Sequence, residues 1–348
     1  MLNPFSLIFG RPPAAQIERT EEKNNILKSF QGETLNKPSF LITGVRGSGK
    51  TVLMTEIAAE LEKNKDWIVV DLNIEFDLIN ELAAKVYSNL RTWNGLHSIK
   101  INVSVFGLEA EMKDTGLHSR ETELCKLLDL LVKRKKKLLI TIDEVAATKN
   151  MRAFAHTYQS LIRQNYPVYL LMTGLYDNVK TLKDDDMLTF LYRMPTINLG
   201  ALDINLISDC YAEIFKLDDE TAMKMARRTK GYAYAFQTLG YETWEESGNF
   251  EKAMRAYRRH LERESYEKIW SELSEKDRFV AGGIAASSTG RVKEVREFLG
   301  MDRNNFNQYR IRLTDRGVLN SDTYGTVRFA LPYFKQFIQN QSRIDEDI

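Results

Sequence analysis

The decapeptide GVRGSGKTVL at residues 44–53 decides the fold of this sequence. It begins with a match to the pattern G-x-x-x-x-G-K-[ST], whose glycines let the backbone wrap around phosphate groups. The preceding residues 39–43, SFLIT, are typical of a short buried strand, and the following VLMTEIAAELEKN has apolar residues at helical spacing. Strand, glycine-rich loop and helix in this order predict a phosphate-binding loop (P-loop), with the helix N-terminus directed at the anion.

Each part of the P-loop has an expected role. Its backbone N–H groups should surround the phosphates, Lys50 should reach the β- and γ-phosphates of ATP, and Thr51 should bind Mg²⁺. The residues expected to contact the nucleotide are Gly44, Val45, Arg46, Gly47, Ser48, Gly49, Lys50, Thr51 and Val52. The side chain of Arg46 has no assigned role, because it can face either solvent or a neighbouring subunit.

An acidic motif lies farther along the chain. Residues 138–144, LLITIDE, form an apolar run that ends in Asp143 and Glu144, as in a buried strand with carboxylates at its end. Asp143 is predicted to hold Mg²⁺, directly or through water, and Glu144 to polarise the attacking water. An Asp-Glu pair can also simply begin a polar loop, but a position after a buried strand in a P-loop protein favours the catalytic interpretation. Together the two motifs predict ATP hydrolysis rather than passive binding.

Strand and helix patterns alternate through the first part of the chain. Further strands are predicted at 66–72, 167–173 and 195–199, and helices at 76–93, 119–133 and 153–166. The alternation predicts an α/β fold, a P-loop parallel sheet with helices on both faces. In such a sheet the P-loop lies at the carboxyl ends of the strands.

Two segments of this region have two open interpretations each. Residues 98–112, SIKINVSVFGLEAEM, alternate apolar and polar side chains around Gly107, which predicts an inserted β-hairpin. The hairpin can be a partner-binding edge or a small cover for the sheet. Residues 133–137, KRKKK, form the densest basic run. Nucleic-acid binding is one interpretation, but a helix C-terminus stabilised by cations is favoured, because the run leads directly into the strand at 138.

The remainder of the chain is predicted to be mostly helical. Residues 203–263 have helical periodicity throughout, which predicts an all-helical lid over the nucleotide. From 274 onward, three short helices precede an alternating segment that turns at Tyr324-Gly325, the pattern of a winged helix-turn-helix domain. The expected domains are a segment of the nucleotide site at 1–35, the ATPase domain at 36–202, the lid at 203–265, the winged helix at 266–340 and an acidic tail at 341–348.

The third helix of the winged helix, at 304–316, is expected to enter a DNA major groove. Asn, Gln and Arg side chains can read base edges, and Arg side chains also bind phosphates. The DNA-binding candidates are Arg303, Asn304, Asn305, Asn307, Gln308, Arg310, Arg312, Arg316 and Arg328. Winged helices also bind proteins, and acidic residues dilute the charge of this one, so a protein partner is the alternative to double-stranded DNA.

The composition is that of an ordinary globular protein. The chain has 348 residues, of which 43% are hydrophobic and 28% charged, and its formal net charge is +1. Cys125 and Cys210 lie in apolar helical contexts and are predicted to be free buried thiols, and the histidines lack the spacing of zinc ligands. No segment has the length and hydrophobicity of a membrane span or the pattern of a signal peptide, so a cytoplasmic protein without a membrane partner is expected.

The order of these motifs resembles the AAA+ and STAND branch of P-loop ATPases, and more narrowly the archaeal-type, origin-recognition-like ATPases. Residues 3–5, NPF, and 9–13, FGRPP, match the N-P-F…F-G-x-x-P-P segment that opens many members of this type. Residues 190–195, FLYRMP, are similar to the family's F-L-x-R-A-P. Residues 229–237, TKGYAYAFQ, are similar to its G-Y-P-Y-x-x-Q, with Ala233 in place of Pro. The resemblance covers essentially the whole chain.

The resemblance implies roles for three more residues. Arg19 matches the Arg of a Gly-Arg pair that helps to seat the adenine, with Glu18 in place of the Gly. Thr173 matches the sensor-1 position, whose polar side chain faces the γ-phosphate. Arg193 matches an arginine finger or sensor, with an ordinary surface salt bridge as the alternative.

These observations predict a slow, Mg²⁺-dependent switch ATPase whose ATP state is coupled to DNA binding or assembly through the winged helix. The alternative is a signalling, defence or mobile-element regulatory ATPase whose winged helix binds protein. A second copy of the chain or a protein partner is compatible with both. A metabolic P-loop kinase is disfavoured, because the sequence shows a lid and a winged helix but no acceptor-substrate pocket.

Overall fold

The computed structural model describes residues 2–8, 10, 12–32, 37–91, 117–185, 188–320 and 324–346. The chain divides into two compact units. The sheet unit consists of Thr20–Thr43 and Lys50–Asn198, and the helical unit of Met1–Arg19, Gly44–Gly49 and Leu199–Ile348. The division runs through the P-loop, whose residues Gly44–Gly49 belong to the helical unit while Lys50 begins a helix of the sheet unit. The hairpin predicted at 98–112 lies outside the described residues.

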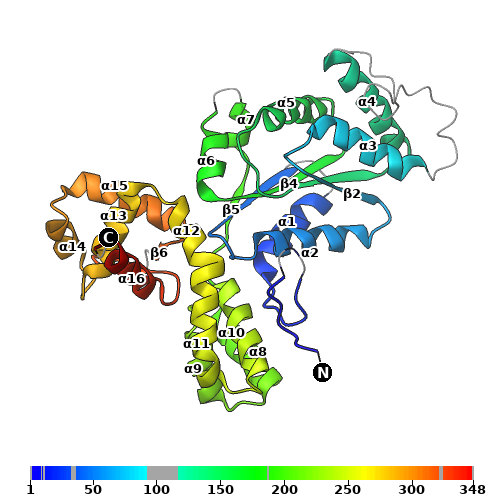
Figure 1. Cartoon of the computed structure of the whole chain (residues 1–348). Coiled ribbons are helices and arrows are strands. Elements are labelled where there is room, and N and C mark those ends of the chain that lie inside the picture. The colour runs from blue at the N-terminus through cyan, green and yellow to red at the C-terminus, as the bar shows by residue number, and fades with distance from the viewer. Residues whose placement is uncertain are drawn as a thin grey trace. The chain divides into compact units, whose positions relative to one another are not determined.

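The sheet unit contains a five-stranded parallel sheet of order β2-β3-β4-β1-β5. Its strands are β1 (Ser39–Thr43), β2 (Trp67–Leu72), β3 (Lys137–Ile142), β4 (Val168–Gly174) and β5 (Thr196–Asn198). Its helices are α1 (Thr20–Gln31), α2 (Lys50–Glu62), α3 (Leu78–Arg91), α4 (Leu117–Lys133), α5 (Lys149–Arg163), α6 (Tyr176–Lys183) and α7 (Thr189–Tyr192). Helices α1 and α2 cover one face of the sheet and α3, α4 and α5 the other (Figure 1). The predicted α/β fold is confirmed.

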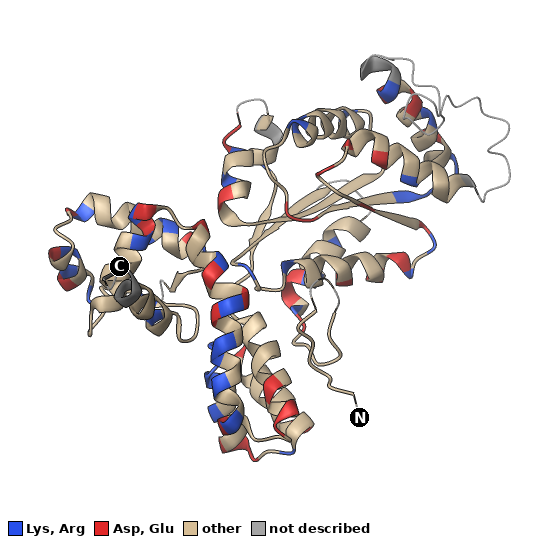
Figure 2. Ribbon diagram, in the orientation of Figure 1, with Lys and Arg blue, Asp and Glu red and all other residues tan. Residues whose placement is uncertain are grey.

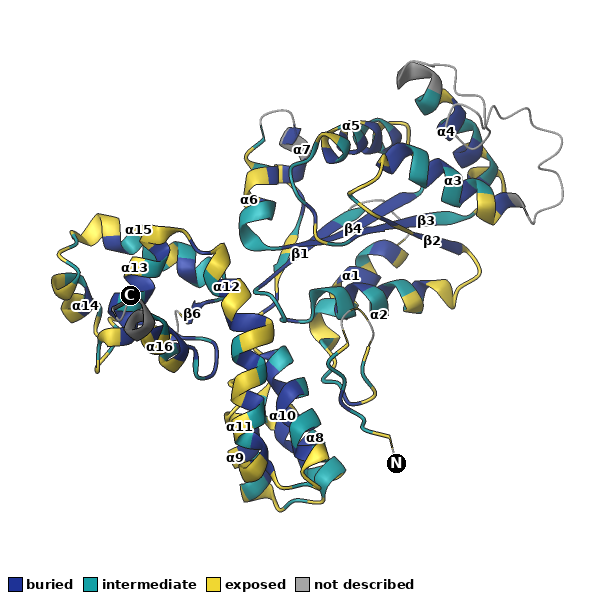
Figure 3. Cartoon of the chain, viewed as in Figure 1, coloured by how far each residue is buried: buried dark blue, intermediate teal, exposed yellow. Residues whose placement is uncertain are grey.

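The apolar strands explain the position of the sheet in the core. Every residue of β4 is buried, and so is β3 from Leu138 to Ile142, as expected for strands covered on both faces (Figure 3). Because parallel strands end at the same edge, Asp143 after β3 and Thr173 in β4 lie near one another. The basic run at 133–137 joins α4 to β3, which is the place that the helix-terminus interpretation expected.

The helical unit begins with a helical bundle. Its helices are α8 (Ile204–Phe215), α9 (Asp219–Arg227), α10 (Ala233–Glu245) and α11 (Phe250–Leu261). The N-terminal segment packs on this bundle through Phe5, which is 2% exposed and stacks on Phe215 at a centroid distance of 5.7 Å. Gln237 also binds the N-terminal segment, accepting a hydrogen bond from the Ser6 N–H (3.0 Å) and donating one to the Ala15 carbonyl (2.6 Å). The NPF segment and the TKGYAYAFQ motif therefore meet in the structure.

A π-helix, Glu262–Tyr266, and the short helix α12 (Glu267–Glu272) connect α11 to residues 274–346, which we call the C-terminal segment. This segment contains α13 (Glu275–Ala286), α14 (Val292–Phe298), α15 (Arg303–Asp315), an antiparallel pair β6 (Leu319–Asn320) and β7 (Arg328–Phe329), and α16 (Phe334–Glu346). Three helices precede the strand pair, in the order expected from the sequence, and the winged-helix assignment stays a prediction.

The last helix differs from the expectation, because α16 continues to Glu346 through residues that were expected to form an acidic tail. Its N-terminal half is anchored by Phe334 and Phe337, whose rings lie 4.9 and 5.8 Å from that of Tyr266 in the π-helix. Packing of these two rings on Tyr266 stabilises the first turns of α16. The helix then continues into the polar residues that follow.

Among the described residues, no helix has the length and apolar character required to cross a membrane. In the same residues no group of three or more His, Cys, Asp or Glu side chains is arranged to hold a metal ion. Cys125 and Cys210 are free and half-buried, and burial raises the pKa of the Cys210 thiol to about 11, so that it stays protonated at neutral pH.

Candidate functional site

Three of the predicted residues of the sheet unit meet in one hydrogen-bonded group. The hydroxyl of Thr51, in the first turn of α2, donates to one carboxylate oxygen of Asp143 at 2.8 Å. The hydroxyl of Thr173, which is fully buried, donates to the other oxygen of the same carboxylate. This arrangement follows from the strand order, because β4 lies between β1 and β3 and brings Thr173 beside Asp143.

Glu144 follows in an unusual backbone conformation. Its φ is 51°, in the left-handed region that non-glycine residues rarely adopt. Its N–H donates to the Asp143 carboxylate at 3.0 Å and to the Thr173 hydroxyl at 3.3 Å, which holds this conformation in place. Such a residue stores about 1–3 kcal/mol of strain, and strained residues of this kind concentrate at active sites. The Glu144 side chain is exposed, so its carboxylate is accessible to water.

The oxygen atoms of this group suit magnesium. Mg²⁺ in phosphate-binding sites takes one or two protein oxygens, keeps several waters and uses the phosphate oxygens for the rest. The hydroxyl of Thr51 and the carboxylate of Asp143 are oxygens of this kind, and they already lie within hydrogen-bonding distance of each other. Lys50, at the N-terminus of α2, directly precedes Thr51.

In the helical unit, the first part of the P-loop is fixed through its carbonyl groups. The Tyr232 hydroxyl donates to the Arg46 carbonyl at 2.6 Å, and the Tyr234 N–H donates to the Gly47 carbonyl at 3.0 Å. Both donors belong to the TKGYAYAFQ motif. The contact is so close that Gly47, with φ of 75°, accepts no side chain, because a Cβ there would collide with the Tyr232 hydroxyl and stand 2.8 Å from the Tyr234 Cβ.

Arg19 fixes the next carbonyl of the loop. Its guanidinium donates to the Ser48 carbonyl at 3.1 Å and to the Gly200 carbonyl at 2.7 Å. The residue expected beside the adenine therefore lies at the P-loop backbone. The Ser48 hydroxyl is buried and has no hydrogen-bond partner among the described residues.

The hydroxyl of Tyr232 connects the loop to the π-helix. Burial raises the pKa of this hydroxyl, so it keeps its proton and donates it to Arg46. Since a tyrosine has one hydroxyl proton, the second contact of its oxygen, with the Ser265 hydroxyl at 2.8 Å, has Ser265 as donor. The side chain touches both the loop and the π-helix that precedes α12.

Two side chains of the loop contact the region around the C-terminal segment. The guanidinium of Arg46 forms an ion pair with Glu272 at the end of α12, with a separation of 3.0 Å. This contact answers the question that the sequence left open, because Arg46 binds within its own chain. Val45 lies against Gly317, just after α15: a Cβ at position 317 would stand 3.1 Å from the Val45 Cβ.

Replacing Tyr232 by Phe is expected to loosen the P-loop. The change removes the hydroxyl and leaves a buried Ser265 hydroxyl and a loop carbonyl without their partner, which costs about 1–3 kcal/mol. The thermal midpoint should fall, and the dissociation constant of a fluorescent ATP analogue should rise. Tyr241→Phe, on the same bundle, is the control and should change neither. Wild-type melting together with wild-type nucleotide affinity in the Tyr232 variant would show that the hydroxyl does not hold the loop.

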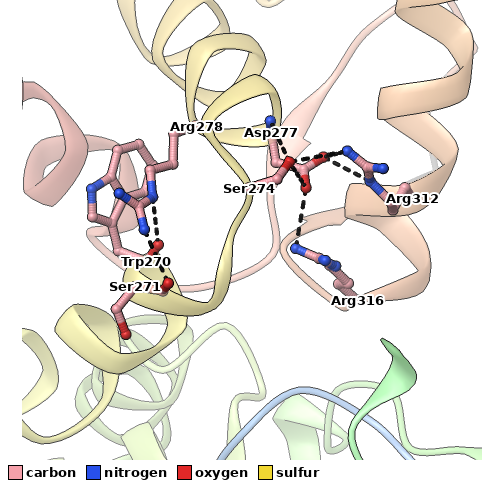
Figure 4. Close-up of polar contacts among 7 residues, drawn as sticks. All are labelled: Trp270, Ser271, Ser274, Asp277, Arg278, Arg312 and Arg316. Carbon is pink, nitrogen blue, oxygen red and sulfur yellow. Dashed lines mark hydrogen bonds and ion pairs between the residues drawn. The ribbon is translucent and has the colours of Figure 1, made fainter. Parts of the chain in front are cut away.

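The DNA-binding candidates lie on or near α15, with different environments. Arg303, Asn304, Asn305, Gln308 and Arg328 are exposed, while Asn307 and Arg310 are half-buried. A terminal guanidinium nitrogen of Arg310 donates to the side-chain oxygen of Asn307 at 2.8 Å. Arg312 is different, because its guanidinium donates to the buried Asp277 at 2.8 Å from Nε, and Arg316 lies 3.3 Å from the same carboxylate (Figure 4). Both of these arginines thus have an internal partner.

Some predicted residues stay apart, and some that matter were missed. Arg193 lies in the turn after α7 and is exposed. No role was expected for Lys230, whose ammonium donates to the Phe329 carbonyl at 2.9 Å and whose pKa is lowered by partial burial of that ammonium. Tyr232 was expected to be a core residue of the lid rather than a contact of the P-loop, and no role was expected for Glu272. The likeness of residues 229–237 to a family motif was a signal for Tyr232 and Lys230, whereas nothing local marks Glu272.

The fold is similar to that of several solved archaeal proteins. The Walker-type ATPase PABY2304 of Pyrococcus abyssi superimposes with a TM-score of 0.62 at 17% identity, covering 92% of this chain and 95% of that one. The ORC2 protein of Aeropyrum pernix gives 0.59 at 13%, covering 97% and 98%. Cdc6p of Pyrobaculum aerophilum gives 0.50 at 13%, covering 98% and 97%. These likenesses show that the chain has the fold of these archaeal proteins, which is the fold that the resemblance of the motifs implied.

Sequence comparison adds little beyond this. Residues 263–338 match a family described as "Domain of unknown function (DUF8462)". The match begins in the π-helix and ends in α16, so the C-terminal segment and its connecting helices form one recognisable sequence unit. No curated protein is similar enough in sequence to count as a relative.

Proposed function

We propose that this chain is an ATPase switch that binds ATP with Mg²⁺ at its P-loop, hydrolyses it slowly and couples the nucleotide state to duplex-DNA binding by a C-terminal winged helix. The fold supports the first part of this proposal, and the Aeropyrum pernix ORC2 protein, with the same fold, was solved as complexes with ADPNP and ADP. Residues 44–52 would surround the phosphates with Lys50, while Thr51 and Asp143 would hold Mg²⁺. Bound Mg²⁺ would neutralise phosphate charge.

The remaining roles follow from the same geometry. Glu144, exposed beside Asp143, would orient and polarise the attacking water. Thr173, bonded to both residues, would sense the γ-phosphate through Asp143. Arg193 is exposed and is our candidate for a finger that reaches the nucleotide of a second copy of the chain.

The contact between the P-loop and the C-terminal segment carries the coupling. Val45 of the loop lies against Gly317, one residue beyond the C-cap of α15, and Arg46 pairs with Glu272 of α12. Arg278 of α13 in turn donates to the carbonyls of Trp270 and Ser271 near the end of α12, at 2.9 and 3.0 Å (Figure 4). A ligand that changes the P-loop therefore acts on residues that adjoin the DNA-reading candidates.

ATP is expected to change duplex-DNA affinity by about 5- to 150-fold, the range of ordinary coupling energies between two sites. The measurement is fluorescence anisotropy of a labelled duplex with ATP, with ADP and without nucleotide, across a salt series. Lys50→Ala should abolish the nucleotide effect but not the nucleotide-free binding. Equal affinity in all three states would remove the coupling, and a complete lack of duplex binding at low salt would remove the DNA-binding function.

A protein partner is the second candidate for the C-terminal segment. Three large apolar side chains are exposed on its first three helices, namely Phe279 (57%), Phe298 (71%) and Ile311 (49%). Exposed apolar side chains of this size are common in protein interfaces. If the segment binds a protein, Phe298→Ser should disrupt ATP-dependent assembly with that protein and leave duplex binding unchanged. If the segment binds DNA, Gln308→Ala should weaken duplex binding and leave protein assembly unchanged.

A further inference from the structure

A row of cations runs along one side of α11 and into the π-helix. Lys252, Arg255, Arg259 and Arg263 are all exposed and are separated by three, four and four residues. This spacing places them on one face of a helix. At a rise of about 1.5 Å per residue the row is about 16 Å long. We call these four residues the α11 basic face, and Figure 2 shows the Lys and Arg residues of α11 in blue.

Of these four side chains, Arg259 interacts electrostatically with Glu242 of α10. Within the described part of the chain, none of them forms an ion pair or a side-chain hydrogen bond. Neighbouring charges differ in this respect. Glu251 is paired with Lys224 at 2.7 Å, and the guanidinium of Arg258 lies over the Tyr333 ring at 4.2 Å. Two glutamates flank Arg263 in the sequence, the half-buried Glu262 and the exposed Glu264. The α11 basic face thus presents four exposed cations that no ion pair with a described residue neutralises.

The side chains of the α11 basic face favour a phosphate backbone over a protein or a membrane as the partner. The large apolar side chains of α11 are buried in the bundle, and between the cations the face offers only the half-buried Ala256. A protein interface depends on aromatic or aliphatic anchors, and a membrane-surface helix inserts an apolar side. The α11 basic face has neither. A phosphate backbone requires only charge and hydrogen-bond donors, and the guanidinium groups of three arginines supply both.

We propose that the α11 basic face binds the phosphate backbone of duplex DNA without reading its sequence. A duplex carries one negative charge per about 1.7 Å of its axis, so that roughly nine phosphates pass along a face about 16 Å long. Backbone contacts of this kind position a protein on DNA, while base contacts supply specificity. The choice of duplex DNA rests on the proposed function, but the face is separate from α15 and from the nucleotide site, and its contribution requires no ATP.

The test is a salt series with the full chain, without nucleotide, on a labelled duplex of mixed sequence. Each lost phosphate contact lowers the slope of log affinity against log salt by about 0.9. The double variant Arg255→Ala/Arg259→Ala should therefore bind more weakly at low salt, with a slope smaller by about 2. Between about 50 and about 200 mM salt its affinity should fall about tenfold less than that of the wild type. The matched control, Arg255→Lys/Arg259→Lys, keeps the charge and should keep the slope.

The outcomes are separable from those of the proposed function. A slope that depends on Arg255 and Arg259 supports the α11 basic face even if ATP changes nothing. Wild-type slope and affinity in the alanine variant, with its melting curve unchanged, would overturn the proposal while leaving ATP-coupled binding through α15 intact. If the alanine pair weakened binding to polyglutamate or to vesicles of anionic lipid but not to DNA, the partner would be of another class and the proposal would be wrong. If the wild-type chain bound no duplex DNA, both the α11 proposal and the proposed DNA-binding function would be wrong.

Discussion

Glu144→Gln is expected to slow ATP hydrolysis by at least about a hundredfold, the typical contribution of a positioned proton-accepting group. ATP itself should remain bound with wild-type affinity, because the change removes a charge and not a phosphate or Mg²⁺ contact. The glutamine is nearly isosteric and inherits the same left-handed backbone with φ of 51°, so the fold around Asp143 and Thr173 should persist. Single-turnover hydrolysis and equilibrium binding of a fluorescent ATP analogue measure the two effects separately.

Two further variants sharpen this experiment. Glu75→Gln removes another carboxylate, from the loop that follows β2, and should leave turnover unchanged. Asp143→Asn should lower both turnover and Mg²⁺ affinity, because Asp143 is the proposed Mg²⁺ ligand that Thr51 contacts. If Glu144→Gln hydrolysed ATP at the wild-type rate, the residue would be an ordinary polar residue in the turn after β3, and the proposed mechanism would lose its base.

Asp277→Asn is expected to destabilise the C-terminal segment by about 3 kcal/mol, the lower end of the cost of breaking a buried ion pair. Asp277, in α13, is fully buried and accepts a hydrogen bond from the Ser274 hydroxyl at 2.7 Å. Two positive charges face its carboxylate, Arg312 in α15 and Arg316 at the C-cap of that helix. An asparagine keeps the volume but removes the buried negative charge that both guanidinium groups face. Their partial exposure, 34% and 15%, is the reason to expect the lower end of the range.

Hydrogen exchange measures this effect where it occurs. A loss of about 3 kcal/mol should speed exchange of the α13 and α15 amides by about a hundredfold, since each 1.4 kcal/mol is a factor of ten. Exchange in the sheet unit should not change. The control is Asp302→Asn, which makes the same chemical change at the N-cap of α15, where Asn caps as well as Asp. Unchanged exchange in the Asp277 variant would show that the buried triad contributes nothing to the stability of the segment.

The sequence predicted the sheet unit well because its signals are local. Strand β1 coincides with the predicted 39–43, and the loop pattern places Lys50 at the start of α2. Apolar runs that end in Asp143 or Thr173 identify β3 and β4, since strands covered on both faces carry continuous apolar side chains. The family resemblance then supplied the fold of the remainder, which the superpositions confirm.

Features created by contacts between distant residues could not be predicted in the same way. The partner of Arg46 is Glu272, on a short helix more than two hundred positions away, and charged residues on helix surfaces give no local sign of such pairing. The same holds for Arg312, whose sequence context suggests a DNA contact although Asp277 occupies it in the structure. Helix α16 was missed for another reason. Phe334, Phe337 and Ile338 have helical spacing and are all buried, but the segment that carries them is short and mostly polar.

The π-helix between α11 and α12 sets the rotational phase of everything that follows it. Each residue of an α-helix turns the chain by about 100°, so the extra residue of a π-turn rotates the downstream helix by about that amount relative to an uninterrupted one. With this phase, Tyr266 faces α16 and Glu272 faces Arg46. Deleting one residue from Glu262–Tyr266 would keep a continuous helix and nearly the whole composition, yet would point the next turn of side chains at different neighbours. The π-turn therefore fixes the angle between the two halves of the helical unit through the length of the connection, and Ser265 and Tyr266 then make the contacts that this angle permits.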